Sequence, residues 1–113
     1  MNLAGLVEQL GLQAFTGREE LKRAVSGGYV GDLLSDVMAH ARQGNLWITI
    51  QAHPNIVAVA VFKQLAAIVL VNGREPAAET VQQAEKEGVP ILGTPLSAFE
   101  LVGKLYELGL KGK

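Results

Sequence analysis

The chain has 113 residues, of which 49% are hydrophobic and 19% charged, with a formal net charge of -1 and no cysteine. This length allows one domain, and the composition excludes a disordered tail, a polycation for phosphate backbones, disulfides and thiolate chemistry. Because aromatic residues make up only 5% of the chain, stacking surfaces for nucleic acid are scarce, and we expect one domain over residues 1–113 that binds no nucleic acid.

The N-terminus lacks the basic and apolar regions of a secretory signal, so we expect a cytoplasmic protein. Residues 45–72 have Lys63 as their only charged residue, but Gln51, His53 and Pro54 interrupt the apolar runs. A membrane-spanning helix needs about 20 consecutive apolar residues. The segment therefore predicts the buried centre of a globular fold, without membrane association.

The N-terminal quarter contains short elements. The apolar spacing of residues 3–10 predicts a helix, which Gly11 ends. Residues 12–16 favour a short strand, and residues 17–21 favour a turn or a single helical turn. Residues 24–26 then lead to a glycine pair, which we expect to follow the end of a strand.

Glycine is over-represented, at 13 of 113 residues against a typical share of about 7%. The cluster of residues 27–31 matches neither a dinucleotide-binding fingerprint nor a P-loop. Its glycines permit a tight turn or a close chain crossing, or they let a ligand or a second subunit approach the backbone. We take Gly27, Gly28 and Tyr29 as the candidate contact surface of a homodimer.

The rest of the chain alternates helices with apolar strands. We expect a helix from Asp32, as its N-cap, to Gly44. Pro54 suits the first turn of the next helix, and Ser97 to Glu100 is a capping-box pattern. The expected strands are residues 46–50, 66–71 and 89–92, and the later helices are residues 56–65, 76–87 and 97–109.

This order predicts the α/β class. Strands that alternate with helices of about ten residues form right-handed crossovers and a mostly parallel sheet. The near-continuous apolar run of residues 67–71 agrees, because a parallel sheet is covered on both faces. We expect a single compact domain with a mostly parallel central sheet flanked by helices.

Ligands of open parallel sheets bind outside the carboxyl ends of the strands. The side chains expected there, and hence the candidate ligand-binding residues, are Gln51, His53, Asn55, Asn72, Arg74 and Thr94. Arg74 and His53 could meet a phosphate or carboxylate, whereas the amides could read a base or sugar. Each has a structural alternative: His53 as a helix cap, Asn72 as a turn residue, and Thr94 as part of a helix start.

Catalytic groups are few. Ser26 and Ser35 have no evident histidine partner, and His40 is expected away from the strand ends. The histidines and carboxylates show no metal-ligand spacing. We therefore predict no catalytic residue, no metal and no cofactor, with an enzyme of unknown reaction as the least favoured hypothesis.

Three segments carry a resemblance to a known family: residues 70–76, 84–92 and 94–100. They resemble the DRTGG domain family. The similarity is strongest over residues 44–108, and residues 26–35 resemble small stand-alone members. The family's Asp-Arg pair is absent near Gln51, and its Thr-Gly-Gly is replaced by Val71-Asn72-Gly73.

The resemblance implies a compact α/β regulatory module. Related domains accompany nucleotide-sensing domains in some pyrophosphatases and help to form a dimer. A more distant similarity to the N-terminal domain of HPr kinase/phosphorylase implies no kinase activity, because the P-loop domain has no counterpart here. Our leading hypothesis is a non-catalytic regulatory or interaction domain that homodimerises, through helices or through sheet edges, or contacts another protein. The alternative is a sensor for an adenine nucleotide or similar anionic ligand at the strand ends.

Overall fold

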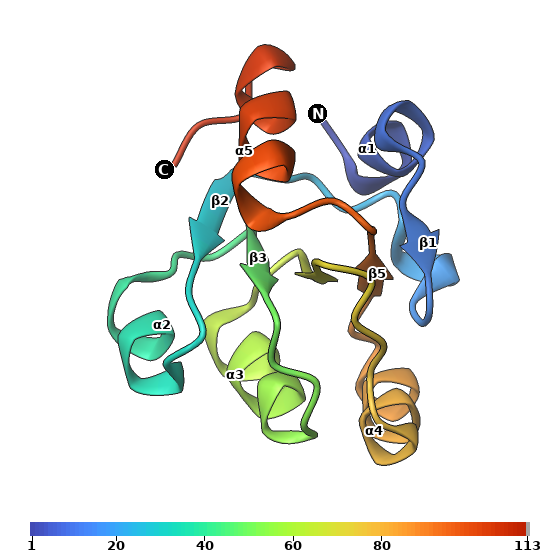
Figure 1. Cartoon of the computed structure of the whole chain (residues 1–113). Helices are drawn as coiled ribbons and strands as arrows, with labels where there is room; N and C mark the ends of the chain where they lie inside the picture. Colours follow the sequence, from blue (N-terminus) through green and yellow to red (C-terminus); the bar gives the residue numbers. More distant parts are fainter. Residues whose placement is uncertain (113) are drawn as a thin grey trace.

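The computed structural model describes residues 1–112, which form one five-stranded sheet between two layers of helices (Figure 1). The strands follow the order β1-β5-β4-β3-β2 across the sheet. The strands are β1 (Gln13–Ala14), β2 (Gly27–Val30), β3 (Asn45–Thr49), β4 (Ala67–Leu70) and β5 (Ile91–Gly93). The helices are α1 (Leu3–Leu10), α2 (Leu34–His40), α3 (Asn55–Lys63), α4 (Ala78–Glu87) and α5 (Ala98–Glu107), and Arg18–Glu20 form one 3-10 turn.

The sheet is mostly parallel, as predicted. Strands β2, β3, β4 and β5 pair in parallel with one another in chain order, and only the two-residue β1 is antiparallel, beside β5. The three crossovers of the same hand place α2, α3 and α4 together on one face of the sheet. Helices α1 and α5 cover the other face (Figure 1). The fold is therefore α/β, and all four parallel strands end at one edge of the sheet.

Side chains that alternate along the strands build two cores. On β3, Leu46 and Ile48 pack toward α1 and α5, whereas Trp47 packs toward the layer of α2, α3 and α4. Residues 45–49 are all buried, which fits a central parallel strand. The indole N–H of Trp47 donates to the carbonyl of Gly31 at 2.8 Å, so the largest buried side chain also ties β3 to the loop after β2.

Most predicted elements are present, with boundaries that differ by a few residues. The valine-rich helix after Pro54 is confirmed as α3, in which Pro54 is the N-cap. Asn72 and Gly73 both have positive φ and form the predicted turn after β4. Ser97 caps α5 by accepting a hydrogen bond from the backbone N–H of Glu100 at 3.2 Å.

Two expectations near the glycine cluster are wrong. The strand lies at Gly27–Val30, so the glycines belong to the strand itself and do not follow its end. Asp32 does not cap α2: its N-cap is Leu33, which makes no side-chain capping bond. The Asp32 carboxylate is engaged by β3 instead, and helix α2 starts without side-chain help.

No helix within residues 1–112 is long and apolar enough to cross a membrane.

Candidate functional site

The carboxyl ends of the parallel strands carry a network centred on Asp32. Its carboxylate accepts hydrogen bonds from the Thr49 hydroxyl at 2.7 Å and from the Ile50 backbone N–H at 2.9 Å. The side-chain amide of Gln51 donates to the backbone carbonyl of Asp32 at 2.8 Å. The loop after β2 is thereby fixed against the end of β3, and Gln51 is held in place by a polar partner within the chain.

The loops after β3, β4 and β5 are also bonded to one another. The carbonyl of Ala52 accepts from the Ala77 N–H at 3.2 Å and from the Thr80 hydroxyl at 2.6 Å. The backbone N–H of Gly73 donates to the carbonyl of Thr94 at 2.9 Å. These bonds connect the starts of α3 and α4 and the turn after β5, and give a rigid edge.

The predicted ligand residues lie on the loops along this edge. His53 Nδ1 accepts from the backbone N–H of Asn55 at 3.4 Å, which is the capping role considered for it. Thr94 is buried, and its hydroxyl accepts from the Leu96 N–H at 3.2 Å. Asn72 and Arg74 are exposed on the turn that leads to α4. A ligand role for these residues, and for Gln51, stays a prediction.

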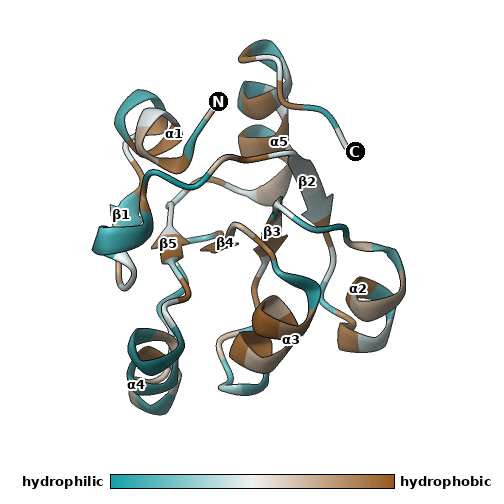
Figure 2. Cartoon of the chain, turned by 180° about the vertical axis from the view of Figure 1, so that it is seen from behind, coloured by the Kyte–Doolittle hydropathy of each residue, from teal (hydrophilic) through white to brown (hydrophobic). Residues whose placement is uncertain are grey.

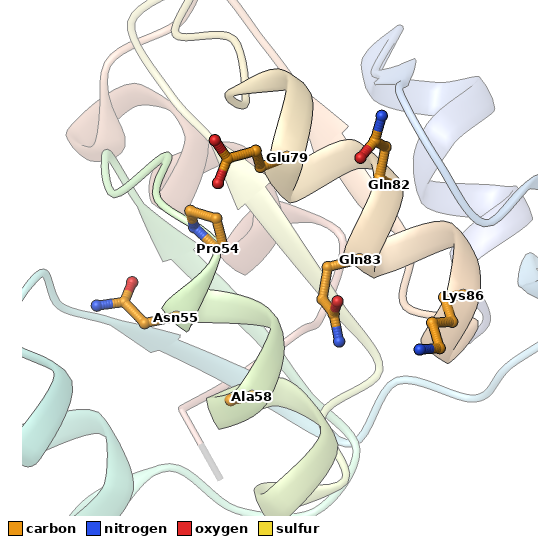
Figure 3. Close-up of a pocket in the computed structure, with 7 residues that line it drawn as sticks. All are labelled: Pro54, Asn55, Ala58, Glu79, Gln82, Gln83 and Lys86. Atoms are coloured by element: carbon orange, nitrogen blue, oxygen red, sulfur yellow. The ribbon is translucent and has the colours of Figure 1, made fainter.

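Asn55 lines an open groove between α3 and α4 with a volume of about 570 Å³ (Figure 3). One wall comes from the start of α3, and the other comes from one face of α4. The groove is lined by Pro54, Asn55, Ala58, Glu79, Gln82, Gln83 and Lys86. Its walls combine amides with one carboxylate and one ammonium group, a composition that suits a polar surface better than an apolar ligand. None of the α4 residues in this groove was among the candidates from sequence.

The candidate contact residues Gly27, Gly28 and Tyr29 form most of β2, the strand at one end of the sheet. Gly27 is buried, and the Gly28 N–H donates to the carbonyl of Lys111 at 3.0 Å, so the C-terminal segment contacts part of this edge. The dimer contact at these residues stays a prediction.

Tyr29 belongs to a series of hydrogen-bonded side chains on the outside of β2 and α2. Its hydroxyl donates to Asp36 Oδ2 at 2.5 Å, and Asp36 Oδ1 lies 3.1 Å from His40 Nδ1. The hydrogen bond to Asp36 raises the pKa of Tyr29 above its usual value, and partial burial and the negative charge of Asp36 act in the same direction. A phenol held in its neutral form is a poor nucleophile at neutral pH, so this series of side chains fits a structural role.

The remaining candidate groups for catalysis are dispersed. Ser26 Oγ donates to the carbonyl of Gln43 at 2.8 Å, whereas His40 is exposed on α2 and lies 3.1 Å from Asp36 Oδ1. Within residues 1–112 no three His, Asp or Glu side chains are grouped so that they could hold a metal ion.

Comparisons with known proteins agree with this architecture. The sequence profile of the DRTGG domain matches residues 5–108. One similar solved structure contains the CBS and DRTGG domains of the regulatory region of Clostridium perfringens pyrophosphatase, complexed with the activator diadenosine tetraphosphate. The TM-score is 0.75 at 19% identity, over 89% of this chain and 44% of the other, so this chain spans less than half of that region. No curated protein matches significantly.

Proposed function

The chain belongs to the DRTGG domain family, and from this premise we propose that it is a non-catalytic regulatory domain that acts through protein contacts, first of all with a second copy of itself. Residues 1–112 carry no grouped metal ligands, and their histidines and Tyr29 are bonded in structural roles. The cysteine-free sequence suits the reducing cytoplasm, where we place the domain.

The observation that carries this proposal is the exposure of large apolar side chains. Two of the three phenylalanines point outward: Phe62 is 74% exposed and Phe99 is 87% exposed. Leu33, beside the end of β2, is 67% exposed. Single exposed aliphatic residues are normal. When most phenylalanine side chains of a chain lie outside the core, however, we expect another surface to cover them. A small domain has limited area for such contacts within itself.

The mass of the chain in solution tests this proposal. Light scattering after size-exclusion chromatography at micromolar concentrations is expected to give twice the 12.0 kDa of one chain. A mass of one chain at every concentration would reject self-association as the basis of the function.

A second candidate function is the sensing of an anionic nucleotide at the carboxyl edge. Arg74 is exposed on the turn before α4, and α4 begins without a side-chain cap. A cation beside uncapped backbone N–H groups suits a phosphate. The complex of the pyrophosphatase regulatory region with diadenosine tetraphosphate supports the same idea.

Thermal-shift titration with adenine mono- and dinucleotides tests the second candidate. A rise in melting temperature that Arg74→Ala abolishes, and that Arg18→Ala on the 3-10 turn leaves unchanged, would support it. No response to any nucleotide would reject it without affecting the first proposal.

A further inference from the structure

Helix α3 is apolar on all sides although it lies on the surface. Its nine residues carry no charge before Lys63. Ile56, Val57, Val59 and Ala60 are buried against the sheet, while the outward positions Ala58, Val61 and Phe62 are exposed, Val61 by 44%. Figure 2 shows α3 as apolar, in contrast with the hydrophilic outer side of α4. A helix that is hydrophobic all round is normally buried, which indicates that the outer face of α3 is covered in the working protein.

Phe62 lies on the same row of α3 as two residues that line the groove between α3 and α4. Asn55, Ala58 and Phe62 lie at spacings of three and four residues, and therefore on one row of α3. Asn55 and Ala58 form the α3 wall of the groove of about 570 Å³ described above (Figure 3). The small side chain of Ala58 leaves its middle open. One face thus carries both an aromatic projection and a recess beside it.

The groove also has opposite charges at its two ends. Glu79 lies near the start of α4 and Lys86 near its end, both on the wall of the groove. Within residues 1–112 neither takes part in an ion pair. Seven residues separate Glu79 from Lys86, and seven separate Asn55 from Phe62, so both pairs are spaced by about 10.5 Å along their helices.

We propose that this face, made of α3, α4 and the groove between them, is the surface through which two copies of the chain associate. The inference rests on the proposed function, because it names the surface of the dimer proposed there. The two-fold axis lies in the plane of the interface, perpendicular to α3 and α4, and crosses each helix at its midpoint. It stacks α3 on α3 and α4 on α4 in antiparallel orientation. Each interface patch is then self-complementary, as isologous contacts require.

This arrangement satisfies both features with one axis. Glu79 lies opposite the partner subunit's Lys86, and the reciprocal pair forms at the other end. The same axis, if it crosses α3 midway between Asn55 and Phe62, sets Phe62 over the end of the groove at the partner subunit's Asn55. A two-fold axis parallel to the helices would instead stack α3 on the partner subunit's α4, so that the charges of α4 would face a helix with no charge before Lys63. The charge pattern therefore selects a second copy as the occupant and the antiparallel orientation.

Charge exchange in the full chain tests the surface and the orientation together. Glu79→Lys and Lys86→Glu, each alone, place like charges opposite each other twice, and are expected to raise the dimer dissociation constant about tenfold or more. The double variant with both changes restores opposite charges and is expected to return within about threefold of the unchanged chain. Phe62→Glu is expected to give a monomer. Phe99→Glu, on α5 in the other helical layer, is the matched control and is expected to leave the dimer intact.

The outcomes separate this inference from the proposal on which it rests. Circular dichroism of each variant shows whether the fold is retained, and sedimentation velocity gives its mass. The unchanged chain could be a dimer that is unaffected by Phe62→Glu and by the charge exchange but is lost in a Val30→Glu variant of β2. This result would overturn the proposal that the α3–α4 surface forms the dimer, but not the proposal that the chain dimerises. Single and double charge variants that weaken association equally would overturn the antiparallel orientation. An unchanged chain that is monomeric throughout would overturn both.

Discussion

The carboxylate of Asp32 accepts a hydrogen bond of 2.7 Å from the hydroxyl of Thr49, which is buried at the end of β3. The same oxygen accepts from the backbone N–H of Ile50 at 2.9 Å. Without this carboxylate, the Ile50 N–H and the Thr49 hydroxyl would lose the acceptor that they share, and the hydroxyl would keep only the bond that it accepts from the Gln51 N–H at 3.2 Å. The relationship fixes the loop that follows β2 and sets the geometry of the carboxyl edge.

Replacing Asp32 should therefore destabilise the fold. Asp32→Ala leaves the Thr49 hydroxyl without its acceptor, and we expect the free energy of unfolding to fall by about 1–3 kcal/mol. Urea denaturation measures the change. Ser35→Ala, at an exposed position on α2, is the control and should stay within about 0.5 kcal/mol. Equal effects of the two substitutions would contradict a special role for Asp32.

Two buried threonines should differ in their contribution to stability. The Thr16 hydroxyl, in a residue only 1% exposed, donates to the Val89 carbonyl at 2.6 Å and accepts from the Ile91 N–H at 2.8 Å. In Thr16→Val, each of these two buried backbone groups loses its hydrogen bond to the hydroxyl. We expect each lost bond to lower the free energy of unfolding by about 1–3 kcal/mol. The Thr80 hydroxyl donates one bond, to Ala52, so Thr80→Val is expected to cost less. Thermal unfolding of both variants provides the measurement, and a larger loss at Thr80 would disagree.

A pair of glycines offers a test of backbone packing. Gly17 has a φ of +74°, and a Cβ there would lie 2.5 Å from Cα of Pro90. Gly17→Ala should cost more than the roughly 1–2 kcal/mol of a left-handed alanine, because backbone has to move. Gly103 lies within α5 with open space at its Cβ position, and Gly103→Ala should stabilise by about 0.5–1 kcal/mol. Opposite signs in a denaturant titration are expected; equal signs would show that the packing at Gly17 is looser than described.

The Tyr29–Asp36 bond predicts a loss of stability in alkaline solution. Because the hydrogen bond raises the pKa of Tyr29 in the folded chain, the unfolded chain releases this proton first. The stabilisation is complete below the ordinary tyrosine pKa of about 10 and disappears as the pH rises through the folded value. Ultraviolet titration of tyrosinate is expected to show a late step that Tyr29→Phe removes. Asp36→Asn should shift this step to lower pH, and no shift would refute the assigned cause.

The fold could be predicted from sequence more completely than the site. Apolar strands such as β4 and the capping residue Ser97 act locally, so their patterns survive without knowledge of the tertiary structure. The sequence predicts that a strand ends before Gly27, because Gly27 and Gly28 have low strand propensity, but pairing with β3 overrides this preference. Asp32 resembled a helix cap, but a buried hydroxyl and a strand-end N–H compete for its carboxylate.

The surface features depend on which side of a helix faces the sheet. The apolar sequence of α3 predicts burial on every side, and only the structure shows that Phe62 is on the outside. Likewise, the sequence around Glu79 and Lys86 predicts only a polar helix, and the structure shows that both residues line a groove beside α3. Both facts come from the packing of separate segments, which no local pattern encodes.

Sedimentation equilibrium of the unchanged chain over a wide concentration range tests the central claim most directly. We expect a monomer–dimer equilibrium that reaches twice 12.0 kDa at micromolar concentration. A single species of 12.0 kDa across the whole range would contradict the claim that this DRTGG domain acts as a homodimer.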